Sequence, residues 1–134
     1  MLHRSYNYAR ELLNMVDLDL LEHRLLAAAL AGEPVTYGAL LTFFERRVAP
    51  NNVRALCRDI GRVTSRIEAA GGPDLACLVV RASDGLPGAG YFKSLRDAGR
   101  YAGADTGPDA EAFVASEQAL AQRYAERCAK RMDG

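Results

Sequence analysis

The stretch that decides the fold is PNNVRALCRDIGRVTSRIEAAGGPDLACLVV, residues 50–80. Its apolar residues recur every three or four positions, the spacing of one buried helix face; they are Val53, Leu56, Cys57, Ile60, Val63 and Ile67. This spacing predicts a helix over 53–70, with a break and a cap at 50–52 and a stop at Gly71, Gly72 and Pro73. The apolar run at 75–80 then predicts a short strand.

The residues that follow predict a second strand. Turn-forming residues at 83–88 separate the run at 75–80 from Tyr91 and Phe92. We therefore expect an antiparallel β-hairpin between 75 and 92.

Three helices are expected before residue 50. Asp19 as a cap and Glu22 three residues later indicate a helix start, and Gly32 ends that helix. An extended entry and a short helix follow at 35–41, with Thr36 as a candidate cap, and a further helix is expected around 8–15. Helices followed by a hairpin are the order of a winged helix-turn-helix, so the predicted fold class is mainly α with a small β-hairpin.

A long amphipathic helix is predicted from about 109 to 132. Its apolar stripe is Phe113, Leu120, Tyr124, Cys128 and Met132. The domain division that follows is a winged-helix domain with an N-terminal helical segment at 1–93, and a C-terminal helical extension at 94–134. The stripe must be buried, either against the rest of this chain or in association, and we expect a homodimer to which this helix contributes.

Composition excludes several classes of protein. The chain of 134 residues has no signal-peptide pattern and no apolar run long enough for a membrane span, so we expect a cytoplasmic protein. The two histidines and three cysteines form no metal-binding motif, so no metal or cofactor is expected, and each cysteine is expected in the core. Net charge is zero, but residues 35–66 hold six basic and two acidic side chains.

The basic block contains a regular stripe of arginines. Arg54, Arg58, Arg62 and Arg66 fall four residues apart, on the side of the predicted helix away from its apolar face. In a helix-turn-helix such a helix enters the major groove, where arginine binds phosphate or guanine. The alternative interpretation of the stripe is a solvated helix face.

Several short motifs resemble the winged-helix domain of alkylguanine-DNA alkyltransferases and alkyltransferase-like proteins over about residues 17–92. They are VTYG at 35–38, NVRAL at 52–56 with GR at 61–62, VVRASDG at 79–85 and GY at 90–91. The resemblance implies that Tyr37 and Arg54 press on the DNA, where they would replace a flipped nucleotide in the stack. The candidate DNA-binding residues are Tyr37, Asn52, Arg54, Arg58, Arg62, Arg66 and Arg81.

The chain departs from that family at the reacting group. The family's acceptor cysteine lies in a Pro-Cys-His-Arg segment, whereas Cys77 here is slightly out of register and no histidine follows it. We therefore expect a non-enzymatic DNA-binding protein. The alternative is a protein-docking adaptor or inhibitor, since the sequence also resembles small stand-alone domains of bacterial mobile elements and defence loci.

Overall fold

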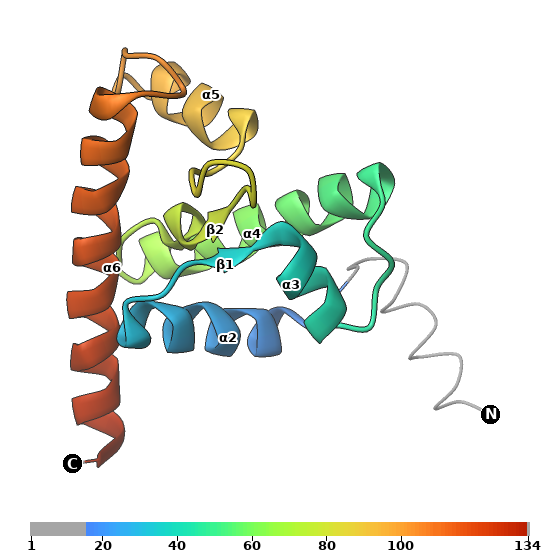
Figure 1. The fold of residues 1–134 in the computed structure, drawn as a ribbon. Helices are drawn as coiled ribbons and strands as arrows, with labels where there is room; N and C mark the ends of the chain where they lie inside the picture. The colour runs from blue at the N-terminus through green and yellow to red at the C-terminus, as the bar shows by residue number, and fades with distance from the viewer. Residues whose placement is uncertain (1–15, 134) are drawn as a thin grey trace.

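The structure is a computed structural model that describes residues 16–133 (Figure 1). The helix expected around 8–15 lies outside the described residues. Within them the chain is mainly helical, with one small parallel sheet. The elements are α2 (Leu18–Ala31), β1 (Val35–Thr36), α3 (Tyr37–Phe43), α4 (Pro50–Ala69), the 3-10 turn η1 (Leu75–Leu78), β2 (Val79–Val80), α5 (Ala89–Asp97) and α6 (Pro108–Asp133).

Helix α2 begins two residues earlier than the sequence suggested. Asp17, and not Asp19, is the N-cap, and its side chain accepts hydrogen bonds from the backbone N–H groups of Asp19 and Leu20 at 2.9 and 3.2 Å. The helix ends at Gly32, which has a φ of 68° and a left-handed conformation that suits glycine. Leu21 and Leu25 of this helix are fully buried in the core.

The predicted antiparallel hairpin is wrong. Strand β2 pairs in parallel with β1, with Val35 opposite Val79 and Thr36 opposite Val80. The first part of the run at 75–80 forms η1, because the Asp74 side chain caps the turn by accepting the N–H of Ala76 at 2.8 Å. Tyr91 and Phe92 lie in α5, where both are buried together with Leu95 one turn later. The segment 81–88 between β2 and α5 is a loop.

Helix α4 agrees with the predicted helix at 53–70 in most respects. It starts earlier, with Pro50 in its first turn and no side-chain cap on Ala49. Its buried apolar residues are Leu56, Ile60, Val63 and Ile67, and Val53 is partly buried. Cys57 is exposed, contrary to expectation, because it sits about a quarter of a turn away from the centre of the buried face.

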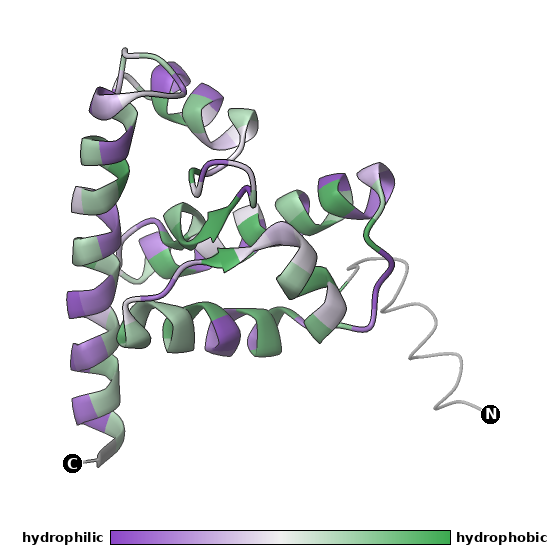
Figure 2. Cartoon of the chain, viewed as in Figure 1, coloured by the Kyte–Doolittle hydropathy of each residue, from purple (hydrophilic) through white to green (hydrophobic). Residues whose placement is uncertain are grey.

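Helix α6 packs along α2 and against η1 through small side chains (Figure 1). Its buried residues are Ala110, Val114, Glu117, Ala121 and Ala125. The predicted apolar stripe is therefore wrong as the buried face: Phe113, Tyr124 and Cys128 are half-buried, and Leu120 and Met132 are 44% and 81% exposed. Alanines let the two helix backbones approach closely, which larger side chains would prevent. Hydrophilic residues gather toward the C-terminal half of α6 (Figure 2).

The segment between α5 and α6 is held to α6 by polar and aromatic contacts. Arg100 pairs with the buried Glu117 of α6, and the rings of Tyr101 and Phe113 lie 4.9 Å apart. Gln118 donates from its side chain to the backbone carbonyl of Cys77 at 2.9 Å, which joins α6 to η1. In the described part of the chain, no helix combines the length and the apolar character that crossing a membrane requires.

Candidate nucleic-acid interface

Helices α3 and α4 are consecutive and joined by a short link at 44–49. Thr36 caps α3, as predicted, by accepting the N–H of Ala39 at 3.1 Å. The helix ends with the Arg46 N–H donating to the Leu41 carbonyl at 2.8 Å, which requires Glu45 to adopt a positive φ of 58°. The link thus turns sharply and delivers an exposed pair of arginines, Arg46 and Arg47, to the start of α4.

Asn52 holds this link against the first turn of α4. Its side-chain amide donates to the backbone carbonyl of Arg47 at 2.7 Å. Asn52 is half-buried, so the structure gives this predicted DNA-binding residue a positioning contact within the chain. Neighbouring Asn51 accepts a hydrogen bond from the Arg54 guanidinium, which orients that side chain at the same end of the helix.

The predicted arginine stripe divides into two parts. Arg54 and Arg58, in the N-terminal half of α4, are exposed, and neither is ion-paired to a carboxylate within residues 16–133. Arg62 pairs with Asp59 at 3.3 Å, and Arg66 pairs with Asp19 and Glu22 of α2 at 3.0 Å each. The charges in the C-terminal half of α4 are therefore largely compensated by carboxylates of this chain.

The ion pair between Arg62 and Asp59 stabilises the fold. Its side chain is 2% exposed and accepts the backbone N–H of Val16 at 3.1 Å as well as the contact from Arg62. A buried carboxylate needs such partners, because an unpaired one is costly to bury. Arg62 thus helps to hold Asp59, which in turn binds Val16 of the segment before α2.

Tyr37 links the start of α3 to the 81–88 loop. The tyrosine is half-buried, and its hydroxyl accepts the backbone N–H of Gly88 at 3.0 Å. Burial raises the pKa of Tyr37, partly offset by that hydrogen bond, and the charges of Cys57 and Arg81 also act on it. Tyr37 therefore ties the start of α3 to the end of the 81–88 loop.

The loop itself is closed by Arg81 and Asp84. Two guanidinium nitrogens of Arg81 contact the Asp84 carboxylate at 3.2 and 2.9 Å, and Asp84 also accepts the N–H of Leu86 at 3.0 Å. The Leu86 N–H and then Arg81 hold the pKa of Asp84 below its ordinary value. Arg81 thus stabilises the loop, and its charge is shared with Asp84.

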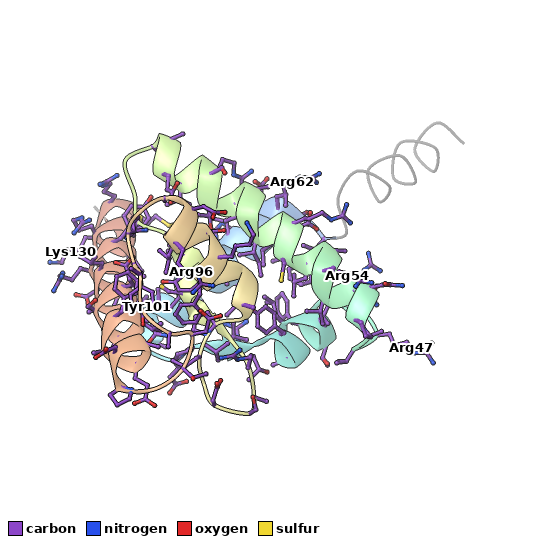
Figure 3. The ribbon with its side chains drawn as sticks, turned by 90° about the horizontal axis from the view of Figure 1, so that it is seen from above. Arg47, Arg54, Arg62, Arg96, Tyr101 and Lys130 are labelled. Atoms are coloured by element: carbon purple, nitrogen blue, oxygen red, sulfur yellow. The ribbon has the colours of Figure 1, made fainter. Side chains whose placement is uncertain are left out.

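We define the arginine end as Arg46, Arg47, Arg54 and Arg58, all exposed in the link or the first half of α4. Arg47 and Arg54 point away from the body at one end of the molecule, and Lys130 of α6 lies at the other (Figure 3). Sequence reasoning had not singled out Arg46 and Arg47. The sequence does show them, as a pair of adjacent arginines a few residues before the start of α4.

The thiol of Cys77 lies in the core. Its side chain is fully buried, its Sγ donates to the Asp74 carbonyl at 3.3 Å, and burial raises its pKa well above the ordinary range. A thiol in this environment stays protonated at neutral pH, which makes it a poor nucleophile. Among residues 16–133 there is also no group of three or more His, Cys, Asp or Glu side chains that could hold a metal ion.

No protein-family model matches this chain, and neither a curated protein nor a solved structure matches it.

Proposed function

We propose that this chain binds duplex DNA through the exposed arginines of the link at 44–49 and of the first half of α4. The observation that carries the proposal is the contrast along the helix. Arg47, Arg54 and Arg58 are exposed and make no ion pair with a carboxylate of residues 16–133, whereas Arg62 and Arg66 further along are paired. Uncompensated arginines at one end of a helix attract phosphate.

The order of the elements supports the same proposal. Helices α2, α3 and α4 follow one another, and the short link at 44–49 leads directly from α3 into α4. In a helix-turn-helix the N-terminal residues of the second helix of the motif contact base edges, and the flanking residues contact phosphates. In this chain Arg54 and Arg58 would take the first role and Arg47 the second.

The proposed role is non-catalytic. Cys77, the residue nearest to the acceptor position of the alkyltransferases that this sequence resembles, is a buried thiol with a raised pKa. Alkyl transfer needs a thiolate that a bound base can reach. We therefore assign the DNA contact to recognition or occupancy of the duplex and not to its repair by this chain.

Fluorescence anisotropy with a labelled duplex over a series of salt concentrations tests the proposal. Each phosphate contact contributes about −0.9 to the slope of log affinity against log salt, so the slope counts how many of Arg47, Arg54 and Arg58 contact phosphate. Arg54→Ala and Arg58→Ala should each weaken binding and reduce the slope by about one if they contact phosphate. Arg123→Ala, which removes an exposed arginine from α6, is the matched control and should leave binding unchanged.

Protein docking is the second candidate, and one observation favours it. Phe43 and Val48, next to the arginine end, are 47% and 62% exposed, and exposed apolar side chains that gather in a patch can mark a site of protein docking. If the parent chain fails to bind duplex or single-stranded DNA at low salt, or if Arg54→Ala and Arg58→Ala behave as Arg123→Ala does, the DNA proposal is wrong. Docking of a protein at this end then becomes the better explanation.

A further inference from the structure

One flank of α6 carries an ordered set of side chains around an exposed leucine. Leu120 lies near the middle of the helix and is 44% exposed. Asp109, in the first turn, and Arg131, near the end, stand eleven residues before and after it. Phe113 and Arg127 stand seven residues before and after it. The flank is thus acidic and aromatic on one side of Leu120 and basic on the other.

These five residues share one face of the helix. Seven residues span about two turns and eleven span about three turns, so positions at these offsets return to the direction of Leu120 to within about 20°. The buried face of α6, made by Ala110, Val114, Ala121 and Ala125, lies about a quarter of a turn away. The flank therefore runs beside the contact with α2 and is separate from it.

The charged groups of this flank are available to a partner. Asp109, Arg127 and Arg131 are exposed, and none of them is in an ion pair within residues 16–133. Arg127 lies over the ring of Tyr124 at 5.9 Å, on the same side of the helix. Phe113 is half-buried: its ring contacts that of Tyr101 and packs against the core, and part of the side chain remains accessible.

We propose that a second copy of this chain docks on this flank, with the two α6 helices antiparallel and the two-fold axis at Leu120. A two-fold interface uses the same patch on both copies, so residues equally far from the axis face one another. Asp109 of each copy then meets Arg131 of the other, and Phe113 meets Arg127 of the other as a cation–π pair. Leu120 packs against Leu120 at the centre.

The order of charges selects the antiparallel arrangement. In a parallel pair Asp109 would face Asp109 and Arg131 would face Arg131, and like charges placed opposite one another repel. In the antiparallel pair every charged residue of the flank meets its opposite or an aromatic ring. Antiparallel helices also align their dipoles favourably. This complementarity of the flank with itself is what identifies a second copy as the partner.

Charge reversal tests the pairing. Sedimentation velocity over a concentration series should show dimers of the parent chain that weaken at high salt. Asp109→Arg and Arg131→Asp should each raise the dimer dissociation constant by roughly tenfold, because each places two like-charged pairs across the axis. The double variant restores opposite charges across the axis and should recover the parent value. Glu126→Arg, an exposed reversal on another face of α6, is the control.

Crosslinking tests the position of the axis. In a background with Cys57→Ser and Cys128→Ser, Leu120→Cys should form a disulfide-linked dimer on mild oxidation, because a residue on the axis meets its own copy. Ala119→Cys, exposed but on a different face, should form much less. A parent chain that is monomeric at all concentrations overturns the proposal. So does a dimer that Asp109→Arg and Arg131→Asp leave unchanged, or one in which Ala119→Cys crosslinks as well as Leu120→Cys.

Discussion

The hydroxyl of Tyr37 accepts a hydrogen bond from the backbone N–H of Gly88, a residue 51 positions later, at a distance of 3.0 Å. This one contact joins the start of α3 to the loop that leads into α5. It fixes the position of the loop relative to α3.

Tyr37→Phe should loosen the 81–88 loop without unfolding the chain. The variant keeps the ring but leaves the Gly88 N–H without its acceptor, and the loss of one hydrogen bond costs about 1 kcal/mol. Urea unfolding should show that decrease in the free energy of unfolding. Amide hydrogen exchange at Gly88 should become faster. Unchanged protection of that amide would mean that the hydroxyl does not hold the loop in solution.

Asp84 should make stability depend on pH in the acid range. The Leu86 N–H and Arg81 lower its pKa in the folded chain below the ordinary value of 3.8. Folding therefore favours the charged form, so the stabilisation is present above about pH 3.8 and is lost as pH falls through the lowered pKa. Asp84→Asn should be less stable than the parent at neutral pH, and thermal unfolding should show the two curves converging in acid. A constant difference down to the lowest pH contradicts the assignment.

Arg66→Ala should act on stability more than on DNA binding. Arg66 joins α4 to α2 through Asp19 and Glu22, and its removal breaks two partly exposed ion pairs. We expect a loss of about 1 kcal/mol in chemical unfolding. The variant should reduce DNA affinity less than Arg54→Ala does in the anisotropy assay. A larger effect on affinity than that of Arg54→Ala would extend the interface along the whole of α4.

Arg100→Ala and Lys93→Ala should differ in cost although both remove a cation from an ion pair. Arg100 pairs with Glu117, whose side chain is 9% exposed, whereas Lys93 and Asp97 are both well exposed. Removing Arg100 leaves a buried carboxylate without its partner, at an expected cost of about 2 kcal/mol. Removing Lys93 should cost less than about 0.5 kcal/mol. Equal effects in parallel denaturation curves would show that burial of Glu117 has no energetic consequence.

Glu45→Gly should stabilise the end of α3. Glu45 has a φ of 58°, which glycine adopts with much less strain than residues with a Cβ. We expect a gain of up to about 1 kcal/mol in the free energy of unfolding. Glu45→Gln removes the charge but keeps the strained backbone, so it should show no such gain. If Glu45→Gln stabilises as much as Glu45→Gly, charge and not backbone strain is the cause.

Much of α4 could be predicted because its signal is local. Leu56, Ile60, Val63 and Ile67 repeat with the period of a helix, and the breakers at 71–73 follow directly. The same holds for the cap at Thr36 and for the end of α2 at Gly32, where one residue type suits one backbone conformation. Arg54 and Arg58 of the candidate site could be predicted too, since their spacing places them on one face of α4, whereas Arg46 and Arg47 lie in the link before the helix and were missed.

Local sequence patterns were enough to predict α2, α3, α4 and α6, and the face on which the arginines of α4 lie, but α5 was predicted as a strand. The parallel pairing of β2 with β1 could not be predicted, because six apolar residues suit a strand or a turn of helix equally and the partner of β2 lies more than forty residues away. The tertiary fold also sets which arginines of α4 form ion pairs. The carboxylates that pair with Arg66 belong to α2, so the sequence pattern of α4 alone could not predict these pairs. In α6 the alanines, and not the larger apolar residues, are buried where the helix packs on α2. The distance between two packed helices depends on the side chains of both, so the sequence of α6 alone does not show which of its faces is buried.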